Sequence, residues 1–378
     1  MTPTEKNPFV AFSIKVWKLM GFLFAPKFKF SRYFCLSINI VLNVFQFAYL
    51  LTESKLDKLI LNGYFTVLYF NSIIRVFVVL KKQRDFERCI HKIAHMCNVI
   101  EAEGDEYMVS LVKETGAKAH KFSILNLCLA LTTGTSFLIY PVFAGMQDLP
   151  YGVYVPGFNI SDRLTYKIFY AYEVLVTPPG ASLYIPFSNL FTSFAFFAIV
   201  LNKILRHKIG LLMERKEEEE HQDDKLVEKR IKIAIIYHKV LIDFVDDINS
   251  LVTNVCFVEL IFFVMLLCAL LFVLNIVELF PQICLSCLYI VLIMTQLFTV
   301  YWSANELDIE SLKINEALYN CPWYDMNEKC KRLLIIFMIR SGRPMQIMAG
   351  SLYPLTLEMF QTLLNVSYSY FTLLRRVY

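Results

Sequence analysis

The sequence predicts an all-α membrane protein with seven transmembrane helices. Of its residues, 57% are hydrophobic and 15% are aromatic, and the mean hydropathy of +0.50 exceeds that of a soluble domain. Apolar runs long enough to cross a hydrocarbon core of ~30 Å recur before a less apolar C-terminal helix, which is the expected seventh span. The runs are Tyr33–Leu51, Leu59–Leu80, Phe122–Ala144, Leu183–Leu205, Thr253–Ile276 and Gln282–Trp302.

The distribution of Lys and Arg predicts a cytoplasmic N-terminus and an extracellular C-terminus. In this orientation the cytoplasmic segments, counted up to Arg332, hold 27 Lys and Arg residues and the external segments hold 6, as the positive-inside rule requires. The sequon Asn159-Ile160-Ser161 then lies in an outer loop, expected to span Gly145–Ser182, so Asn159 is a candidate glycosylation site.

The N-terminal segment contains no secretory signal, because no short apolar core with a small-residue cleavage site precedes the first span. Pro8–Phe24 mixes aromatic and aliphatic residues with Lys15 and Lys18. This composition is typical of an amphipathic helix that lies along the inner membrane surface. An unstructured tail is the alternative.

Two charged residues fall within the apolar runs. Arg75 lies six residues before Lys81, at the inner end of the second run, which is roughly 9 Å along a helix. We expect it to reach the inner interface or to pair with a carboxylate there, and a place on an ion path is the alternative. Glu259, in the fifth run, has no second carboxylate in the same run, and a hydrogen bond near the inner boundary explains it as well as a functional role does.

Catalytic and metal-binding motifs are absent from the sequence. His91 and His95 have the helical spacing of a metal pair, but no third ligand shares their face. There is no phosphate-binding glycine loop and no HExxH motif. The 10 cysteines lie in spans or cytoplasmic segments and do not form a disulfide framework. We therefore expect no enzyme activity, no cofactor, no metal and no nucleic-acid partner.

The outer halves of the second, third, fourth and sixth runs carry many aromatic residues. Several tyrosines there fit the aromatic belt of the membrane interface. Gly134, however, opens space on one helix where bulky residues of other helices face it, and an apolar chamber with few hydroxyl groups fits a small volatile molecule. The candidate ligand-binding residues are Tyr69, Phe70, Ile73, Gly134, Thr135, Leu138, Tyr184, Phe187, Tyr289 and Leu292.

The last helix is expected to be broken at Arg343-Pro344, because proline lacks an amide donor and clashes with the preceding turn. From Met345 the chain is predicted to continue as one helix of about 30 residues, roughly 45 Å long. Polar residues recur between Thr356 and Thr372, too many for a helix that meets lipid on every side. This helix therefore either packs inside the protein or lines a pore.

Roughly the last 75 residues resemble the insect odorant receptors, an ionotropic family unrelated to G-protein-coupled receptors. In the last segment, the resemblance is carried by Arg343-Pro344-Met345, Ala349-Gly350, Tyr353-Pro354-Leu355, Phe360 and Ser367-Tyr368-Ser369-Tyr370-Phe371-Thr372. Upstream of it, the matching residues are Glu306-Leu307, Glu310-Ser311, Ala317, Tyr319, Trp323-Tyr324 and Lys331-Arg332.

The resemblance implies an odorant-tuning subunit of a heterotetrameric, odorant-gated, non-selective cation channel in the plasma membrane of olfactory sensory neurons. Its partners would be shared odorant co-receptor subunits, a small volatile apolar ligand and the lipid bilayer. In that family the odorant binds in the outer half of the bundle and the last helices surround a central pore. The resemblance puts Leu373 at a hydrophobic gate next to Thr372, and Arg376 one turn outward, where the co-receptor has a glutamine.

The resemblance also implies a cytoplasmic helical anchor region built from Arg206–Ser250 and Ser303–Arg340. The predicted segments are 1–32, a cytoplasmic segment with the amphipathic helix; 33–205, transmembrane helices one to four; 206–252, anchor extensions; 253–302, transmembrane helices five and six; 303–343, anchor and first part of helix seven; and 344–378, the pore-lining part of helix seven.

Three other classes are weaker interpretations. A gustatory receptor of the same superfamily is disfavoured because the final helix ends SYSYFTLLR instead of the TYxxxxxQF pattern of that family. A metabotropic seven-helix receptor is disfavoured by the inverted orientation and by the absence of a cysteine from Gly145–Ser182. A transporter is disfavoured because no inverted repeat is visible in the sequence.

Overall fold

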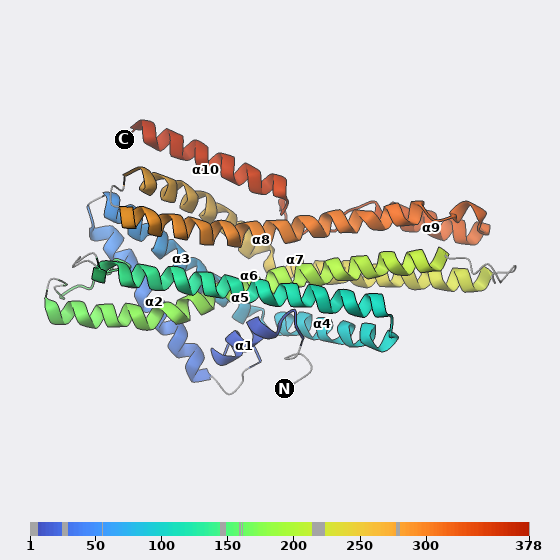
Figure 1. Cartoon of the computed structure of the whole chain (residues 1–378), viewed down its shortest axis with the longest axis horizontal. Helices are drawn as coiled ribbons and strands as arrows, with labels where there is room; N and C mark the ends of the chain where they lie inside the picture. Colours follow the sequence, from blue (N-terminus) through green and yellow to red (C-terminus); the bar gives the residue numbers. More distant parts are fainter. Residues whose placement is uncertain are drawn as a thin grey trace.

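The computed structural model describes residues 7–24, 29–54, 56–143, 149–158, 160, 162–213, 224–276 and 280–377. These residues are almost all helical (Figure 1). The elements are α1 (Ala11–Leu19), α2 (Lys29–Thr52), α3 (Leu56–Lys81), α4 (Gln83–Glu103), α5 (Glu106–Phe143), α6 (Arg163–Met213), α7 (Asp224–Ile276), α8 (Phe280–Tyr319), η2 (Trp323–Asp325), α9 (Glu328–Ser341), β1 (Met348–Ala349), β2 (Tyr353–Pro354) and α10 (Leu357–Val377). The predicted all-α class is confirmed.

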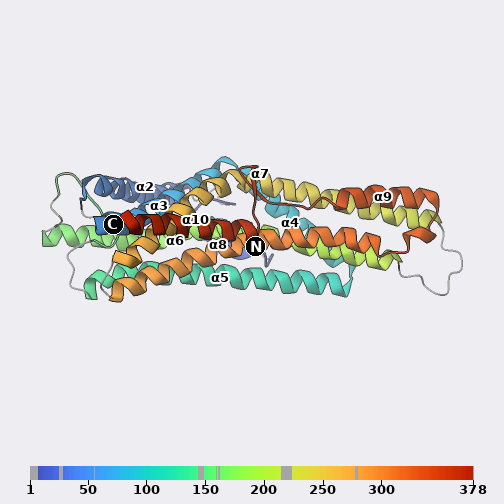
Figure 2. The same ribbon diagram turned by 90° about the horizontal axis from the view of Figure 1, so that it is seen from above.

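The described helices include six that are long and apolar enough to cross a membrane: α2, α3, α5, α6, α7 and α8. Two of them greatly exceed the bilayer in length, since α6 has 51 residues and α7 has 53. At 1.5 Å per residue each is nearly 80 Å long, against ~30 Å of hydrocarbon. Figures 1 and 2 show the result, an elongated bundle with α2, α3 and α10 towards one end and α9 at the other.

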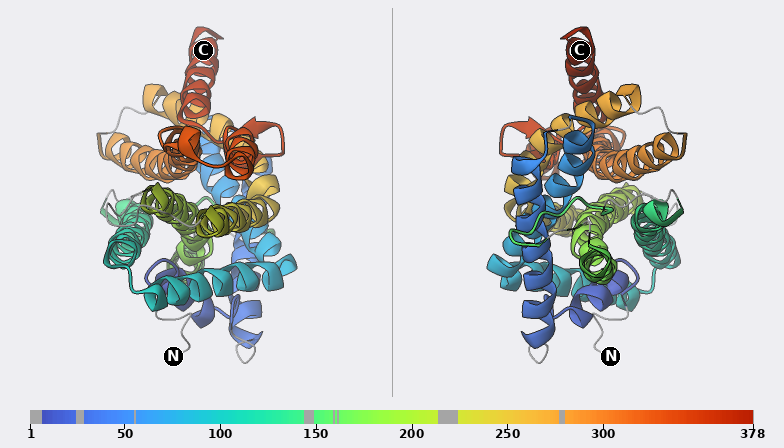
Figure 3. Two further views of the ribbon diagram at one scale, coloured as in Figure 1. Left: turned by 90° about the vertical axis from the view of Figure 1, so that its right-hand side faces the viewer. Right: turned by 90° about the vertical axis from the view of Figure 1, so that its left-hand side faces the viewer.

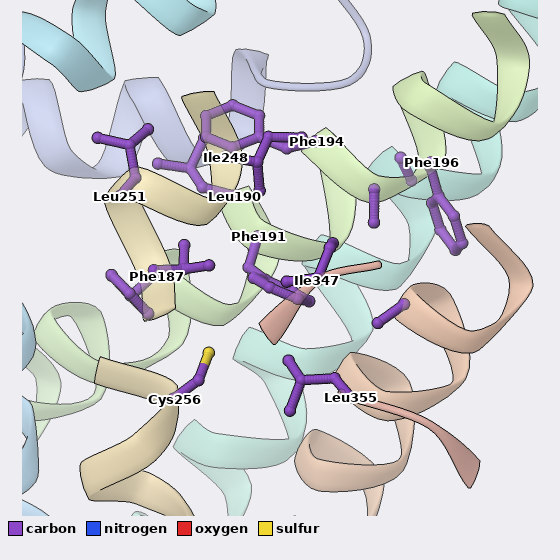
Figure 4. Packing of buried hydrophobic residues seen from close by; sticks show 14 of the residues in the cluster. Phe187, Leu190, Phe191, Phe194, Phe196, Ile248, Leu251, Cys256, Ile347 and Leu355 are labelled. Atoms are coloured by element: carbon purple, nitrogen blue, oxygen red, sulfur yellow. The ribbon is translucent and has the colours of Figure 1, made fainter. Parts of the chain in front are cut away.

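Helix α6 is the centre of the fold. It contacts α1, α2, α3, α5, α7 and α8. Every residue in its apolar centre, from Leu183 to Asn202, is buried. Phe194 and Phe197 are completely buried, and the Phe197 ring packs edge-on against Phe9 and Phe244 at centroid distances of 5.4 and 5.7 Å. Figure 4 shows side chains of α6 meeting those of α7 and of the hairpin segment, Ile347 and Leu355.

The start of α6 differs from the prediction. A fourth span at Leu183–Leu205 was expected after an outer loop, but the helix already begins at Arg163 and runs through Pro178, Pro179 and Pro186. Proline inside a membrane helix is tolerated when neighbours satisfy the carbonyl groups that it frees. Pro186 frees the carbonyl of Ser182, and the indole Nε1 of Trp17 donates to that oxygen at 3.2 Å.

The N-terminal segment forms a short helix, α1, but its apolar face does not lie on the membrane surface. Ile14 and Trp17 are buried, and α1 packs against α5 and α6. The apolar residues that were expected to meet the membrane surface are therefore covered by other helices of the chain.

The chain between α9 and α10 is not the continuous helix that was expected from Met345. The predicted break is present, since α9 ends at Ser341, but a two-stranded antiparallel hairpin follows in the register Met348↔Pro354 and Ala349↔Tyr353. Gly350 and Ser351 have φ values of +62° and +59°, a left-handed conformation that no helix accommodates. Helix α10 begins only at Leu357.

Helix α10 stands at the side of the bundle, and the end-on views show it projecting away from the other helices (Figure 3). It contacts α7 and α8. Leu363 and Ser367 are buried on the face turned towards these helices, and the Ser367 hydroxyl donates to the carbonyl of Leu363 at 2.8 Å. The opposite face is exposed, with Tyr368, Tyr370 and Leu373 each more than half accessible in this chain.

Candidate ligand cavity, gate and buried ion pair

A cavity of about 50 Å³ lies between α3, α5, α6 and α8. Tyr151, from the loop before α6, completes its wall. These helices are the second, third, fourth and sixth of the six apolar helices, the same helices that were predicted to hold the ligand chamber. The cavity is lined by Phe65, Leu68, Tyr69, Ala130, Thr133, Gly134, Tyr151, Thr177, Gly180, Ala181, Tyr184, Ile185, Tyr289 and Leu292.

Small residues bring the helices around the cavity close together. A Cβ atom added at Gly134 of α5 would lie 2.9 Å from Cγ2 of Thr177 on α6. One added at Gly180 of α6 would lie 2.7 Å from Cε1 of Tyr69 on α3. Both distances are shorter than any normal carbon–carbon contact, so these two glycines set the spacing of the three helices. Gly134 therefore makes room on its helix for the close approach of Thr177.

The wall of the cavity is aromatic, with a few hydroxyl groups. Phe65 packs against Tyr151 at a centroid distance of 4.8 Å, and Tyr289 lies 4.7 Å from Tyr64. The Tyr151 hydroxyl is within hydrogen-bond distance of the Thr177 hydroxyl, at 2.8 Å. The hydroxyl of Tyr289 is buried without a hydrogen-bond partner among the described residues. The cavity is therefore apolar with few polar anchors, as ligand cavities usually are.

Glu173 of α6 holds the loop that carries Tyr151. Its side chain is completely buried, and its Oε2 accepts a hydrogen bond from the backbone N–H of Tyr151 at 3.3 Å. This second buried carboxylate was not predicted, because Glu173 lies in the segment that was expected to form an outer loop. It closes the cavity from the loop side by positioning Tyr151.

The structure brings together half of the residues predicted to bind a ligand. Tyr69, Gly134, Tyr184, Tyr289 and Leu292 line the cavity. The other predicted residues lie outside its wall: Leu138 and Phe187 are buried nearby, Ile73 is half-buried, Thr135 is exposed and Phe70 is 37% exposed. Successive helical residues point about 100° apart, so the neighbours of Tyr69 and Gly134 turn away from the cavity.

Several lining residues were missed by sequence reasoning. Thr133, Thr177 and Tyr151 supply the hydroxyl groups of the wall, and Gly180 and Ala181 supply the space. The adjacent small residues at 180 and 181 are a signal that could have pointed to close helix packing. Tyr151 gives no such signal, because it comes from a loop whose position depends on the tertiary fold.

The predicted gate residues lie on the uncovered part of α10. Leu373 is 61% exposed, and Arg376 is exposed one turn further along the helix. Thr372 is half-buried and its hydroxyl donates to the carbonyl of Ser369 at 2.8 Å. Asn159, the predicted glycosylation site, lies outside the described residues.

Arg75 and Glu259, which the sequence analysis treated separately, form a buried ion pair. The Arg75 guanidinium Nε donates to Oε1 of Glu259, and both side chains are at least nine-tenths buried. Arg75 therefore pairs with a carboxylate, as one of the two expected outcomes had it, and does not reach the membrane interface.

The fold is shared with solved structures of an insect olfactory receptor. The structure of OR5 from Machilis hrabei in complex with eugenol superimposes with a TM-score of 0.85, at 14% identity over 98% of each chain. A second structure of the same OR5 receptor superimposes with a TM-score of 0.80, at 13% identity over 94% of this chain and 91% of that one. The chain thus shares the helical fold of these solved structures.

Sequence comparison defines the family. A family model described as 7tm Odorant receptor matches residues 55–368. Odorant receptor 10 of Aedes albopictus is 37% identical over 98% of both chains, and Odorant receptor Or2 of Anopheles gambiae is 38% identical over 99% of both. Odorant receptor 30a of Drosophila melanogaster is 34% identical over 100% of this chain and 98% of its own. The chain belongs to the 7tm Odorant receptor family, and it is a receptor and not an enzyme.

Proposed function

We propose that this chain is the odorant-binding subunit of a heteromeric, odorant-gated, non-selective cation channel formed with a shared co-receptor. In this proposal it resides in the plasma membrane of olfactory sensory neurons, with its N-terminus in the cytoplasm and its C-terminus outside. The observation that carries the proposal is the pairing of an enclosed aromatic cavity with a polar helix, α10, that is left largely uncovered by its own chain.

The cavity supports binding of a small, mostly apolar molecule. At about 25 cal/mol per Å², a ligand that buries ~250 Å² gains roughly 6 kcal/mol before the costs of association. The space of about 50 Å³ is smaller than an odorant, so a ligand displaces the rings that line the cavity. The solved relative was determined with eugenol, and we expect a ligand of similar size for this chain.

The exposed face of α10 supports a pore that is completed by other subunits. Leu373 and its exposed neighbours have no cover in this chain, and a hydrophobic constriction stops ion flow by dewetting. The predicted anchor, at the α9 end of the long helices, would join the subunits on the cytoplasmic side. Binding opens the pore because the ligand fits the open conformation better than the closed one.

Arg376 favours a heteromer over a homomer. Two guanidinium groups ~10 Å apart repel by roughly 0.4 to 1.7 kcal/mol at effective dielectric constants of 80 to 20. A ring of four would add six such pairs and would repel permeant cations at the mouth of the pore. Co-receptor chains with a neutral residue at this position remove most of that repulsion.

The test is electrical recording from cells that express this chain with and without an odorant co-receptor, with G-protein signalling blocked. The probes are eugenol and a panel of small volatile alcohols, esters and phenols. We expect cation current to at least one probe in cells that express both chains and none in cells that express either chain alone. Loss of the response on blocking G proteins would refute the channel.

The proposed orientation has a separate test. A tag after Tyr378 should be stained on intact cells, and a tag at the N-terminus should be stained only after permeabilisation. In the same cells, a mass shift on glycosidase treatment that disappears with Asn159→Gln would place that residue outside. Staining of the C-terminal tag only in permeabilised cells would reverse the orientation.

A further inference from the structure

Arg75 is at the centre of a buried polar cluster in the inner part of the bundle. It is 1% exposed, and besides its ion pair with Glu259 its Nη1 donates to the carbonyl of Tyr184 at 2.8 Å and to the hydroxyl of Ser188 at 2.9 Å. A buried ion pair often stabilises a fold no more than apolar residues of the same volume would. An ionisable pair within the membrane therefore calls for a role other than stability.

One side of this cluster contacts the ligand cavity. The Arg75 guanidinium carbon lies 3.9 Å from the centroid of the Tyr184 ring, and the same ring forms part of the cavity wall. Tyr69, another wall residue, lies less than two helical turns from Arg75 on α3. A ligand that turns the Tyr184 ring therefore changes the immediate surroundings of the Arg75 charge.

The other side of the cluster leads to the base of α10. Glu259 belongs to α7, and the three preceding turns of α7 hold the hairpin. Asn249 donates to the carbonyl of Gln346 and accepts from the N–H of Met348, both at 2.9 Å. Thr253 donates through its hydroxyl to the carbonyl of Met348 at 2.8 Å. The hairpin continues directly into α10, so a movement of α7 is passed to that helix.

The packing around Glu259 leaves room for a second arrangement. A cavity of about 10 Å³ lies beside the ion pair, lined by Glu259, by Gln296 of α8 and by Leu355, just before α10. Gln296 is 2% exposed, and within the described residues neither its amide oxygen nor its amide nitrogen has a hydrogen-bond partner. Its NH₂ group is a ready donor for the Glu259 carboxylate when that carboxylate turns away from Arg75.

We propose that the Arg75–Glu259 pair transmits occupancy of the ligand cavity to the base of the pore helix. This inference rests on the proposed function. A bound odorant displaces Tyr184, the guanidinium follows the ring, and the Glu259 carboxylate exchanges Arg75 for Gln296. Helix α7 then shifts the hairpin that carries α10. Arg75 and Glu259 are positioning residues in this scheme, because neither lines the ligand cavity.

The decisive variant is Glu259→Gln, which keeps the shape of the side chain and removes its charge. It is expressed with the co-receptor and tested with the strongest agonist of the probe panel. The maximal current, normalised to the receptor at the cell surface, should fall by about 5-fold or more. The concentration of the same agonist that raises the unfolding temperature of the purified complex should stay within about twofold of wild type.

A double variant and a control variant distinguish loss of signal transmission from loss of folding. Arg75→Gln combined with Glu259→Gln leaves no unpaired buried charge, so it should reach the surface and show the same loss of maximal current. Asp247→Asn breaks the partly exposed Lys92–Asp247 pair between α4 and α7, which does not touch the cavity, and should leave the current unchanged.

The outcomes separate the two proposals. Absence of agonist current from the wild-type chain with co-receptor refutes the proposed function itself. A wild-type response together with full maximal current in both Glu259 variants overturns the transmission role. Parallel loss of agonist binding and current in the double variant also overturns it, because the pair would then belong to the binding site.

Discussion

Helices α6 and α10 are opposites in how this single chain surrounds them. Every residue of α6 from Leu183 to Asn202 is buried by neighbours from the same chain. Helix α10, in contrast, contacts α7 and α8 and leaves Tyr368, Tyr370 and Leu373 largely exposed. The difference indicates a division of labour. Side chains of α6 stabilise the fold of the chain, whereas the exposed side chains of α10 are available for contacts outside it.

The largest expected effect tests that division directly. Phe194→Ala empties a completely buried site in α6, and removal of a core phenylalanine costs about 3–5 kcal/mol of folding free energy. The unfolding temperature of the purified subunit and its level at the cell surface should both fall sharply. Leu373→Ala on α10 should leave both unchanged while altering the current at zero odorant. Equal destabilisation by the two variants would contradict the division.

The base of α10 should tolerate change less well than its exposed face. Gly350 has a left-handed backbone, and an added Cβ would lie 2.7 Å from the Phe257 ring of α7. Gly350→Ala combines backbone strain with overpacking, so we expect a loss of about 2–4 kcal/mol. The matched control is Gly210→Ala on α6, where nothing lies within 4 Å. Thermal unfolding compares the two, and a neutral Gly350→Ala would show that the hairpin does not fix α10.

A buried histidine in the N-terminal half of α7 makes the stability of the fold depend on pH, in contrast to the apolar centre of α6. His238 is buried against Phe337 of α9, and burial, with Arg340 nearby, lowers its pKa to about 4 from 6.5. Between these two values the unfolded chain binds a proton that the folded chain does not, so stability falls as the pH drops through this window, by roughly 1–3 kcal/mol. Above pH 6.5 the effect is absent.

The measurement is the unfolding temperature at pH 7 and pH 5 for wild type and His238→Phe. The variant keeps a ring against Phe337 and removes the proton site, so it should lose less stability on acidification. His95→Gln, at an exposed position of α4, is the control and should keep the wild-type slope. An unchanged slope in His238→Phe would exclude His238 as the source.

The smallest expected effect comes from removing one threonine hydroxyl, and the same change is made on α6 and on α10 for comparison. Thr177→Val on α6 keeps the shape of the side chain but removes the bond to Tyr151, worth about 0.5–1.5 kcal/mol. Looser closure of the cavity should raise the half-maximal agonist concentration by roughly 2- to 10-fold. Thr362→Val on α10 removes a hydroxyl that bonds only within its own helix, to the carbonyl of Glu358, and should leave that concentration unchanged. A shift in Thr362→Val but not in Thr177→Val would contradict a role of the Thr177–Tyr151 contact in ligand binding.

The fold class follows from the sequence because long apolar runs permit few alternatives in a membrane. The irregular parts of the fold do not follow from the sequence in the same way. Arg163 was expected to lie in an outer loop, but α6 already begins there and runs through three prolines, and the contact of Trp17 with the Ser182 carbonyl depends on a distant part of the chain. The hairpin was missed for a related reason. Gly350 marks a turn, but Ser351 adopts a left-handed backbone that serine rarely prefers.

The cavity was predictable in its location and only partly in its residues. The four helices named from their outer-half aromatic residues and Gly134 do line the cavity, but the rotation of each helix does not follow from the sequence, so Tyr69 lines the cavity while Phe70 and Ile73 do not. The ion pair joins residues 184 positions apart in the sequence. No local pattern relates two such residues, and the packing of α3 against α7 alone brings them together.

The short hairpin before α10 is a point about which the whole of α10 can tilt. The helix has 21 residues, which makes it about 30 Å long, and the hairpin at its base is bonded to Asn249 and Thr253 of α7. A tilt of ~5° at that pivot sweeps the far tip, near Leu373, through about 3 Å. A displacement too small to disturb the packing of α7 is thereby magnified to roughly the diameter of a water molecule.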